Sequence, residues 1–265
     1  VPHIAQGKSD VPGLLLDREA RDEFKRQMEG AGERVRITLD AEFDSQAQSF
    51  TLVATVPGES DEIILMNAEA DGVTAYQGTG AAVVVGILRD LAQRPLSERP
   101  RTVKAIFTTH YSGSRAMEAW AEANPQLQDK VVALVGLETM AGRRWIQNAA
   151  GDFVETSDLQ PMWSYVSGGK NDVLAVSMRD MIEGLSRSPA HALIEDSVVF
   201  SESTYLHREW DLPVITTLST PAYNISAMVP VAEKIDYSVL YELQAGYAAI
   251  VDKLMDVPRK DLDRL

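Results

Sequence analysis

Short hydrophobic runs alternate along this chain with segments of helical spacing. The runs at 63–66, 102–109, 131–137 and 214–218 are continuous, as expected of strands buried on both faces. Helical spacing follows the Gly78-Thr79-Gly80 turn as far as Leu91 and recurs at 114–123, 172–185 and 237–255. Strands separated by helices of this length predict a mostly parallel, mixed central sheet flanked by helices.

The remaining pattern is weaker. Residues 11–16, 35–39 and 50–56 read as strands, and residues 18–30 have the spacing of a helix. The segment 138–169 is polar and rich in glycine, so no regular element is predicted there. The segment between 185 and 214 is predicted to be a loop.

Composition narrows the class of protein. The 265 residues are 45% hydrophobic and 24% charged, as in ordinary globular proteins. The formal charge of −14 and the pI near 4.7 argue against nucleic acid or an anionic membrane as a partner. No hydrophobic run reaches the ~18 residues of a membrane span. Because the chain begins at Val1, its translated N-terminus is expected upstream, and the compartment stays open.

Several common catalytic motifs are missing. The chain has no cysteine, which excludes disulfides, thiolate metal sites and a cysteine nucleophile. The Gly78-Thr79-Gly80 turn lacks the third glycine of a dinucleotide fingerprint, because that position is Val83. No Gly-x-Ser-x-Gly elbow is present. The sequence therefore predicts neither a nucleotide site nor a serine nucleophile of that type.

Polar residues follow the predicted core strands. The carboxyl ends of parallel strands meet at one edge of a sheet, where ligands bind. His110 comes directly after one of these strands. Its imidazole can either take part in a functional site or hydrogen-bond to a loop carbonyl in a structural role, and both interpretations stay open. The residues predicted at this edge are Glu69, Asp71, Tyr76, His110, Tyr111, Glu138, Tyr223 and Asn224.

Taken together, these positions resemble the co-catalytic di-zinc aminopeptidases and carboxypeptidases of metallopeptidase family 28, to which glutaminyl cyclases are related. The resemblance begins near Phe50 and rests also on Ser49 to Gly58, on Gly113-Ser114-Arg115-Ala116 and on the strand and loop at 131–142. It implies a three-layer α/β/α fold for residues 46–265. Residues 1–45 resemble the final part of a protease-associated domain.

The family's zinc ligands are mostly replaced. The replacements are Glu69 for a histidine, Tyr76 for the bridging aspartate, His110 and Tyr111 for paired glutamates, and Asn224 for the last histidine. Asp71 is kept, and Glu138 keeps the acidic type. Because tyrosine and asparagine are poor zinc ligands, the comparison implies no metal and no other cofactor. A single ion held by Glu69, His110 and Glu138 is the alternative.

These observations lead to three hypotheses. The first is a metal-independent enzyme that hydrolyses, or eliminates from, an amide or ester bond in a small-molecule or peptide-like ligand. His110 would be the general base, oriented by Glu69 or Asp71, and Tyr76, Tyr111 or Asn224 would donate to an oxyanion. Glu138 and Tyr223 would contact the substrate. The second hypothesis is an inactive homologue that acts as a binding module, and the third is a single-metal peptidase. A homo-oligomer is left open.

Overall fold

The computed structural model describes residues 16, 18–31, 36, 46, 48, 50–72, 74–109, 115–167, 172–195, 201–219 and 232–262. The chain divides into two compact units, residues 1–49 and 50–265. In the first, helix α1 (Arg18–Ala31) confirms the helix expected there. The strands predicted at 11–16 and 35–39 fall outside the described residues except for Leu16 and Arg36, which are not in a strand. The protease-associated assignment stays a prediction.

The second unit is built on a seven-stranded sheet of order β1-β3-β2-β4-β9-β7-β8. The four strands β3, β2, β4 and β9 are parallel neighbours. β1 pairs antiparallel with β3, β7 pairs antiparallel with β9, and β8 runs parallel to β7. The predicted mixed, mostly parallel sheet is therefore confirmed. The strands are β1 (Leu52–Val56), β2 (Ile63–Glu69), β3 (Thr102–Thr108), β4 (Val131–Leu137), β7 (Met162–Val166), β8 (His191–Glu195) and β9 (Val214–Leu218).

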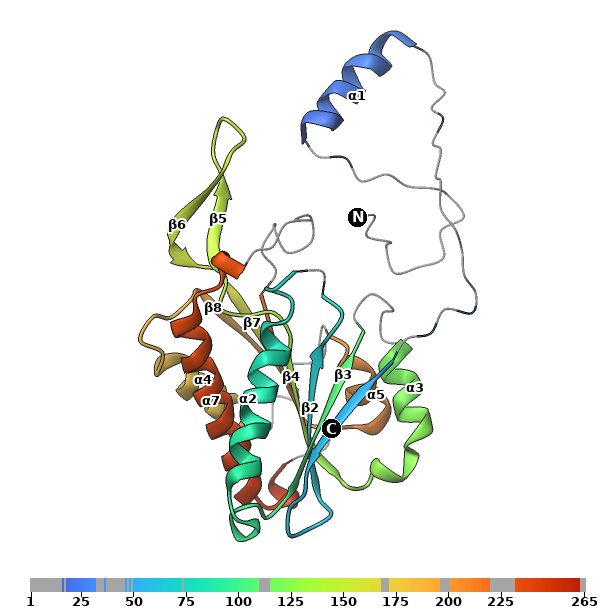
Figure 1. Ribbon diagram of the computed structural model, residues 1–265, viewed down its shortest axis with the longest axis vertical. Helices are drawn as coiled ribbons and strands as arrows, with labels where there is room; N and C mark the ends of the chain where they lie inside the picture. Colours follow the sequence, from blue (N-terminus) through green and yellow to red (C-terminus); the bar gives the residue numbers. More distant parts are fainter. Residues whose placement is uncertain are drawn as a thin grey trace. The chain divides into compact units, whose positions relative to one another are not determined.

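Helices cover both faces of this sheet (Figure 1). One face carries α2 (Thr79–Gln93), α4 (Asp172–Glu183) and α7 (Tyr237–Asp256), and the other carries α3 (Arg115–Ala123) and α5 (Thr204–Trp210). Every residue of β4 is buried, because this central strand has helices on both sides. Between α3 and α5, the Trp120 and Trp210 rings pack with their centroids 5.9 Å apart. Short 3₁₀ helices lie at Leu96–Glu98, Pro125–Leu127, Ala232–Lys234 and Arg259–Asp261.

Two stretches differ from the sequence prediction. The segment predicted without regular structure contains β7 and a separate antiparallel pair, β5 (Arg143–Gln147) and β6 (Phe153–Leu159). The predicted loop before β9 contains β8 and α5. Polar residues make up much of β5, β6 and α5, so these elements lack the continuous hydrophobic run that marks the core strands. Pairing with β9 makes Met162–Val166 a strand, and such pairing is not a local property of the sequence.

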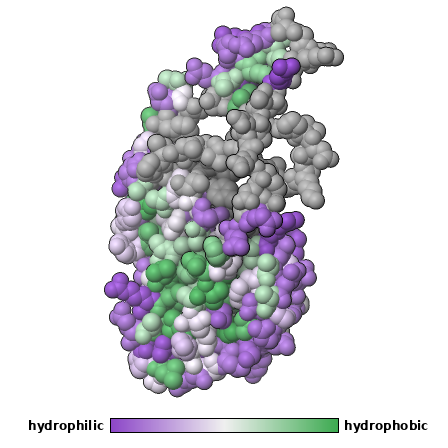
Figure 2. All heavy atoms as spheres, turned by 45° about the vertical axis from the view of Figure 1, so that its right-hand side comes forward, coloured by the Kyte–Doolittle hydropathy of each residue, from purple (hydrophilic) through white to green (hydrophobic). Residues whose placement is uncertain are grey.

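Hydrophobic surface gathers on the face that Figure 2 shows. Exposed large hydrophobic side chains include Leu52 and Val53 on edge strand β1 and Val85 on α2. An exposed hydrophobic edge strand is open to pairing with another chain, and association into a homo-oligomer stays a prediction. In the part of the chain that the structure describes, no helix has the length and hydrophobicity needed to cross a membrane.

Candidate functional site

Three buried glutamates converge at the carboxyl edge of the sheet. Glu69 is the last residue of β2, Glu138 follows β4, and Glu202 lies two residues before α5. One carboxylate oxygen from each lies within 4.8 Å of the other two. The residues are only 5%, 6% and 4% exposed, respectively. We call these three residues the glutamate cluster.

The electrostatics of the cluster are unfavourable for three ionised groups. Burial raises the pKa of Glu138 well above its usual value, and the charges of Glu202 and Glu69 and a hydrogen bond with Glu202 raise it further. Its Oε1 atom is buried and has no hydrogen-bond partner among the described residues. Like charges held together in a low-dielectric site need protons or a counter-charge. The cluster is therefore suited to binding protons or a cation.

The start of α2 positions Glu138. The Thr79 hydroxyl donates to the carbonyl of Tyr76 at 2.7 Å and accepts from the Met140 N–H at 3.0 Å. The Glu138 N–H donates to the carbonyl of Thr217 on β9 at 3.0 Å. Two backbone segments thus anchor the main chain on both sides of Glu138, which keeps its side chain in the cluster.

The segment that carries Glu202 is held against β4 and β9. The hydroxyls of Ser201 and Thr216 are 3.3 Å apart, and the Ser203 N–H donates to the Ser201 hydroxyl at 3.0 Å. A β-carbon on Gly136 would lie 2.5 Å from the Ser203 Oγ, so this close packing needs a glycine on β4. The Ser203 hydroxyl is fully buried and has no partner in the described part of the chain.

The structure brings together two of the predicted site residues, Glu69 and Glu138. Asp71 is half-buried beyond the end of β2, and its carboxylate does not belong to the glutamate cluster. Tyr76 is fully buried and packs with Ile235 in a small hydrophobic cluster, a placement that supports a packing role. The predicted residues outside the described ranges are His110, Tyr111, Tyr223 and Asn224.

Glu202 was missed by the sequence interpretation, which considered only residues that follow strands. Glu202 instead precedes a helix, α5, that leads into β9. A helix that returns the chain to a parallel strand starts at the carboxyl edge, so the residue before it lies there too. The signal that could have found it is an acidic residue ahead of a short helix and a buried strand.

A serine–histidine pair also exists, but its serine is buried in the core. The Nε2 of His191 is 3.0 Å from the Ser164 Oγ, and this hydroxyl is 2.7 Å from the Thr217 Oγ1. The Tyr247 hydroxyl also donates to Thr217. Burial lowers the pKa of His191, and Ser164 is 0% exposed. A substrate cannot reach this hydroxyl, so the pair is structural.

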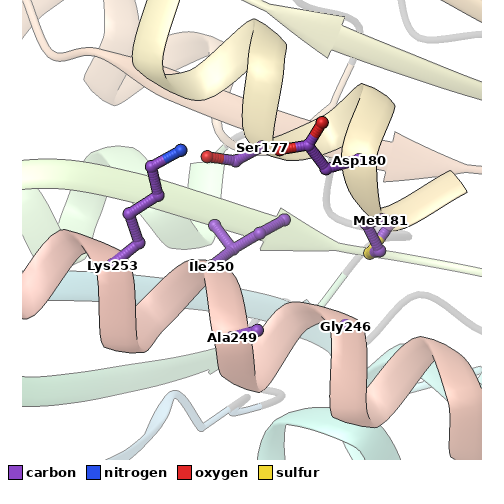
Figure 3. A pocket seen from close by; sticks show the side chains of 7 residues that line it. All are labelled: Ser177, Asp180, Met181, Gly246, Ala249, Ile250 and Lys253. Carbon is purple, nitrogen blue, oxygen red and sulfur yellow. The ribbon is translucent and has the colours of Figure 1, made fainter. Parts of the chain in front are cut away.

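A cavity of about 230 Å³ lies between α4 and α7, and none of the three glutamates is among its lining residues (Figure 3). Asp180 and Lys253 are its charged residues, and the Lys253 amine points toward Ser177. Among the lining residues, Ser177 alone has a hydroxyl group, and this hydroxyl already donates to the Val173 carbonyl at 2.6 Å. The lining therefore offers no activated nucleophile, and the cavity is not a candidate catalytic site.

No protein-family model and no curated protein matches the sequence. Solved structures do match. The chain is similar to the zinc aminopeptidase BSAP from Bacillus subtilis, with a TM-score of 0.57, 13% identity, and coverage of 81% of this chain and 53% of that one. A peptidase M28 precursor from Shewanella amazonensis matches with a TM-score of 0.56 and 17% identity, over 82% of this chain and 47% of that one. A glutaminyl cyclase from Porphyromonas gingivalis matches with a TM-score of 0.53 and 14% identity, over 77% of this chain and 76% of that one.

These likenesses show the three-layer α/β/α fold, and the chain spans about half the length of the aminopeptidases it matches. The two-zinc centre of the family that the sequence resembles does not fit the described residues, in keeping with the replaced ligands noted in the sequence. The glutamate cluster supplies carboxylates alone, whereas zinc in proteins is commonly held with imidazole or thiolate ligands. Tyr76, at the place of the bridging acid, is buried beside Ile235.

Proposed function

We propose that this chain is a hydrolase of amide or ester bonds whose active centre is the glutamate cluster. The observation that supports this proposal is the convergence of three buried carboxyl groups at the carboxyl edge of the sheet. Buried groups with unfavourable electrostatics lower stability, and such groups are concentrated at functional sites. The fold neighbours add support for a peptidase-like hydrolase ancestry.

The chemistry requires one carboxylate and one water molecule. The carboxylate takes a proton from the water as the water oxygen attacks the substrate carbonyl, and it returns the proton to the leaving nitrogen or oxygen. His110 is the alternative general base: its imidazole would take the proton from the water in place of the carboxylate. Tyr111, Tyr223 and Asn224 remain proposed contacts for a small-molecule or peptide-like substrate, with Asp71 as an orienting group.

The experiment is a substrate panel on the purified full chain. It includes aminoacyl nitroanilides, nitrophenyl esters and peptides with N-terminal glutamine, because one fold neighbour is a glutaminyl cyclase. We expect Glu138→Gln and Glu69→Gln to lower kcat/KM about 10²- to 10⁴-fold, the usual contribution of acid–base catalysis. Glu183→Gln, the same change at an exposed position on α4, is the control and should leave kcat/KM unchanged.

Two results would contradict the proposal. Equal turnover by the unsubstituted chain and by Glu138→Gln would remove the cluster as the active centre. The absence of turnover on every member of the panel would favour the alternative, a binding module without catalysis. His110→Ala tests the proposed base separately, because unchanged turnover would exclude that role alone.

A further inference from the structure

The spacing of the glutamate cluster fits one metal ion. An ion bound at about 2.1 to 2.5 Å from each ligand holds its oxygens up to about 4.5 Å apart. The three carboxylate oxygens lie within 4.8 Å of one another, so small side-chain rotations can bring them onto a shared ion. They come from the last residue of β2, from the residue after β4 and from the segment just before α5, and these three elements pack together in one hydrophobic cluster.

A buried carboxylate oxygen of the cluster also points to a ligand. The Glu138 Oε1 atom has no hydrogen-bond partner among the described residues, and Glu138 is only 6% exposed. Buried polar atoms are rarely left without a partner in folded proteins. An ion bound between the three carboxylates can supply the contact that Oε1 lacks.

The kind of donor decides the kind of ion. Carboxylate oxygens are hard ligands that suit Mg²⁺, Mn²⁺ and Ca²⁺. Three of them occupy half of an octahedral shell and leave positions for water. We infer that Glu69, Glu138 and Glu202 together bind one oxygen-preferring divalent cation of the Mg²⁺ or Mn²⁺ type.

This inference replaces the sequence-based expectation that no metal is bound, which was made without Glu202. It also differs from the single-ion alternative, because Glu202 takes the place given there to His110. The inference deepens the proposed function and rests on the same site. Cation binding can nevertheless be measured without any substrate.

The test is a Mn²⁺ titration of the full chain after chelator treatment and dialysis, with free Mn²⁺ followed by electron paramagnetic resonance. We expect one saturable Mn²⁺ per chain, displaced by Mg²⁺, and a higher Tm in the presence of Mn²⁺. Glu202→Gln and Glu69→Gln should each weaken binding at least tenfold while circular dichroism shows a retained fold. The control Glu183→Gln should bind as the unsubstituted chain does.

Three outcomes would overturn the inference: no saturable Mn²⁺ binding, binding unchanged in both glutamine variants, or uptake of two ions per chain. The cation site and the proposed function can fail separately. Mn²⁺ binding without turnover on any substrate overturns the hydrolase and leaves the cation site standing. Turnover that persists in chelator, together with no Mn²⁺ binding, overturns the cation site and leaves the hydrolase standing.

Discussion

Gly80 packs directly on the main chain of Glu138. A β-carbon on Gly80 would lie 2.1 Å from the Glu138 carbonyl oxygen and 2.2 Å from that of Leu137. The first turn of α2 therefore reaches the end of β4 only because this residue has no side chain. The contact fixes the backbone from which the Glu138 carboxyl extends into the glutamate cluster.

Gly80→Ala should destabilise the fold by about 1 to 3 kcal/mol, because the helix or the strand end must move to make room for the methyl group. It should also weaken Mn²⁺ binding, since Glu138 moves with the strand end. Gly78→Ala is the matched control: its β-carbon would be 3.5 Å from the nearest atom, so we expect a change below about 1 kcal/mol. Urea unfolding measures both, and equal stability of the two variants would refute the argument.

Glu138→Gln should stabilise the metal-free protein while it abolishes the rise in Tm caused by Mn²⁺. The substitution removes a carboxyl group whose ionisation is unfavourable in this buried site, and the new amide can donate to Glu202. Relief of an uncompensated buried group is worth about 1 to 3 kcal/mol. Urea unfolding in chelator tests this against Glu183→Gln. A lower stability than the unsubstituted chain would show that the carboxyl group has a structural role.

Asp236 should make stability depend on pH. It caps α7, where its carboxylate accepts from Ser238 Oγ at 2.6 Å and from the Val239 N–H at 3.3 Å, and it pairs with Arg187 at 2.8 Å. Burial alone would raise the pKa of Asp236, but these hydrogen bonds and the positive charge hold it below the usual value. Its stabilisation is therefore present above the unfolded pKa of about 3.9 and is lost as pH falls below it.

Asp236→Asn tests this because asparagine keeps the cap and removes the charge. The variant should be less stable than the unsubstituted chain by about 1 kcal/mol at pH 7. The difference should shrink as urea unfolding is repeated between pH 5 and pH 3. A difference that stays constant over this range would exclude the charge as its source.

Tyr247→Phe should affect stability alone. The Tyr247 hydroxyl donates to Thr217 in the core, and burial raises the pKa of Tyr247 far above its usual value, so the phenol stays neutral. Removing one buried hydrogen bond costs about 1 to 2 kcal/mol. Urea unfolding should show this loss, while Mn²⁺ binding should stay unchanged. Weaker Mn²⁺ binding would mean that the hydrogen-bonded side chains of His191, Ser164, Thr217 and Tyr247 are coupled to the glutamate cluster.

The position of the candidate site could be predicted further than its composition. Continuous hydrophobic runs mark the strands buried on both faces, and β4 and β9 have the predicted bounds. Parallel strands end at a common edge, so Glu69 and Glu138 could be placed together from the sequence alone. The third carboxylate, Glu202, could not be added by this rule because it precedes a helix.

The sequence by itself determined the core strands, the main helices and the edge at which polar residues gather, because each depends on a local pattern of hydrophobicity. Only the tertiary structure decided that β7 and β8 extend the sheet and that Glu202 joins Glu69 and Glu138. It also showed that Gly80 and Gly136 are needed for close packing. These features depend on contacts between distant segments, and a pattern within one segment does not specify its neighbours.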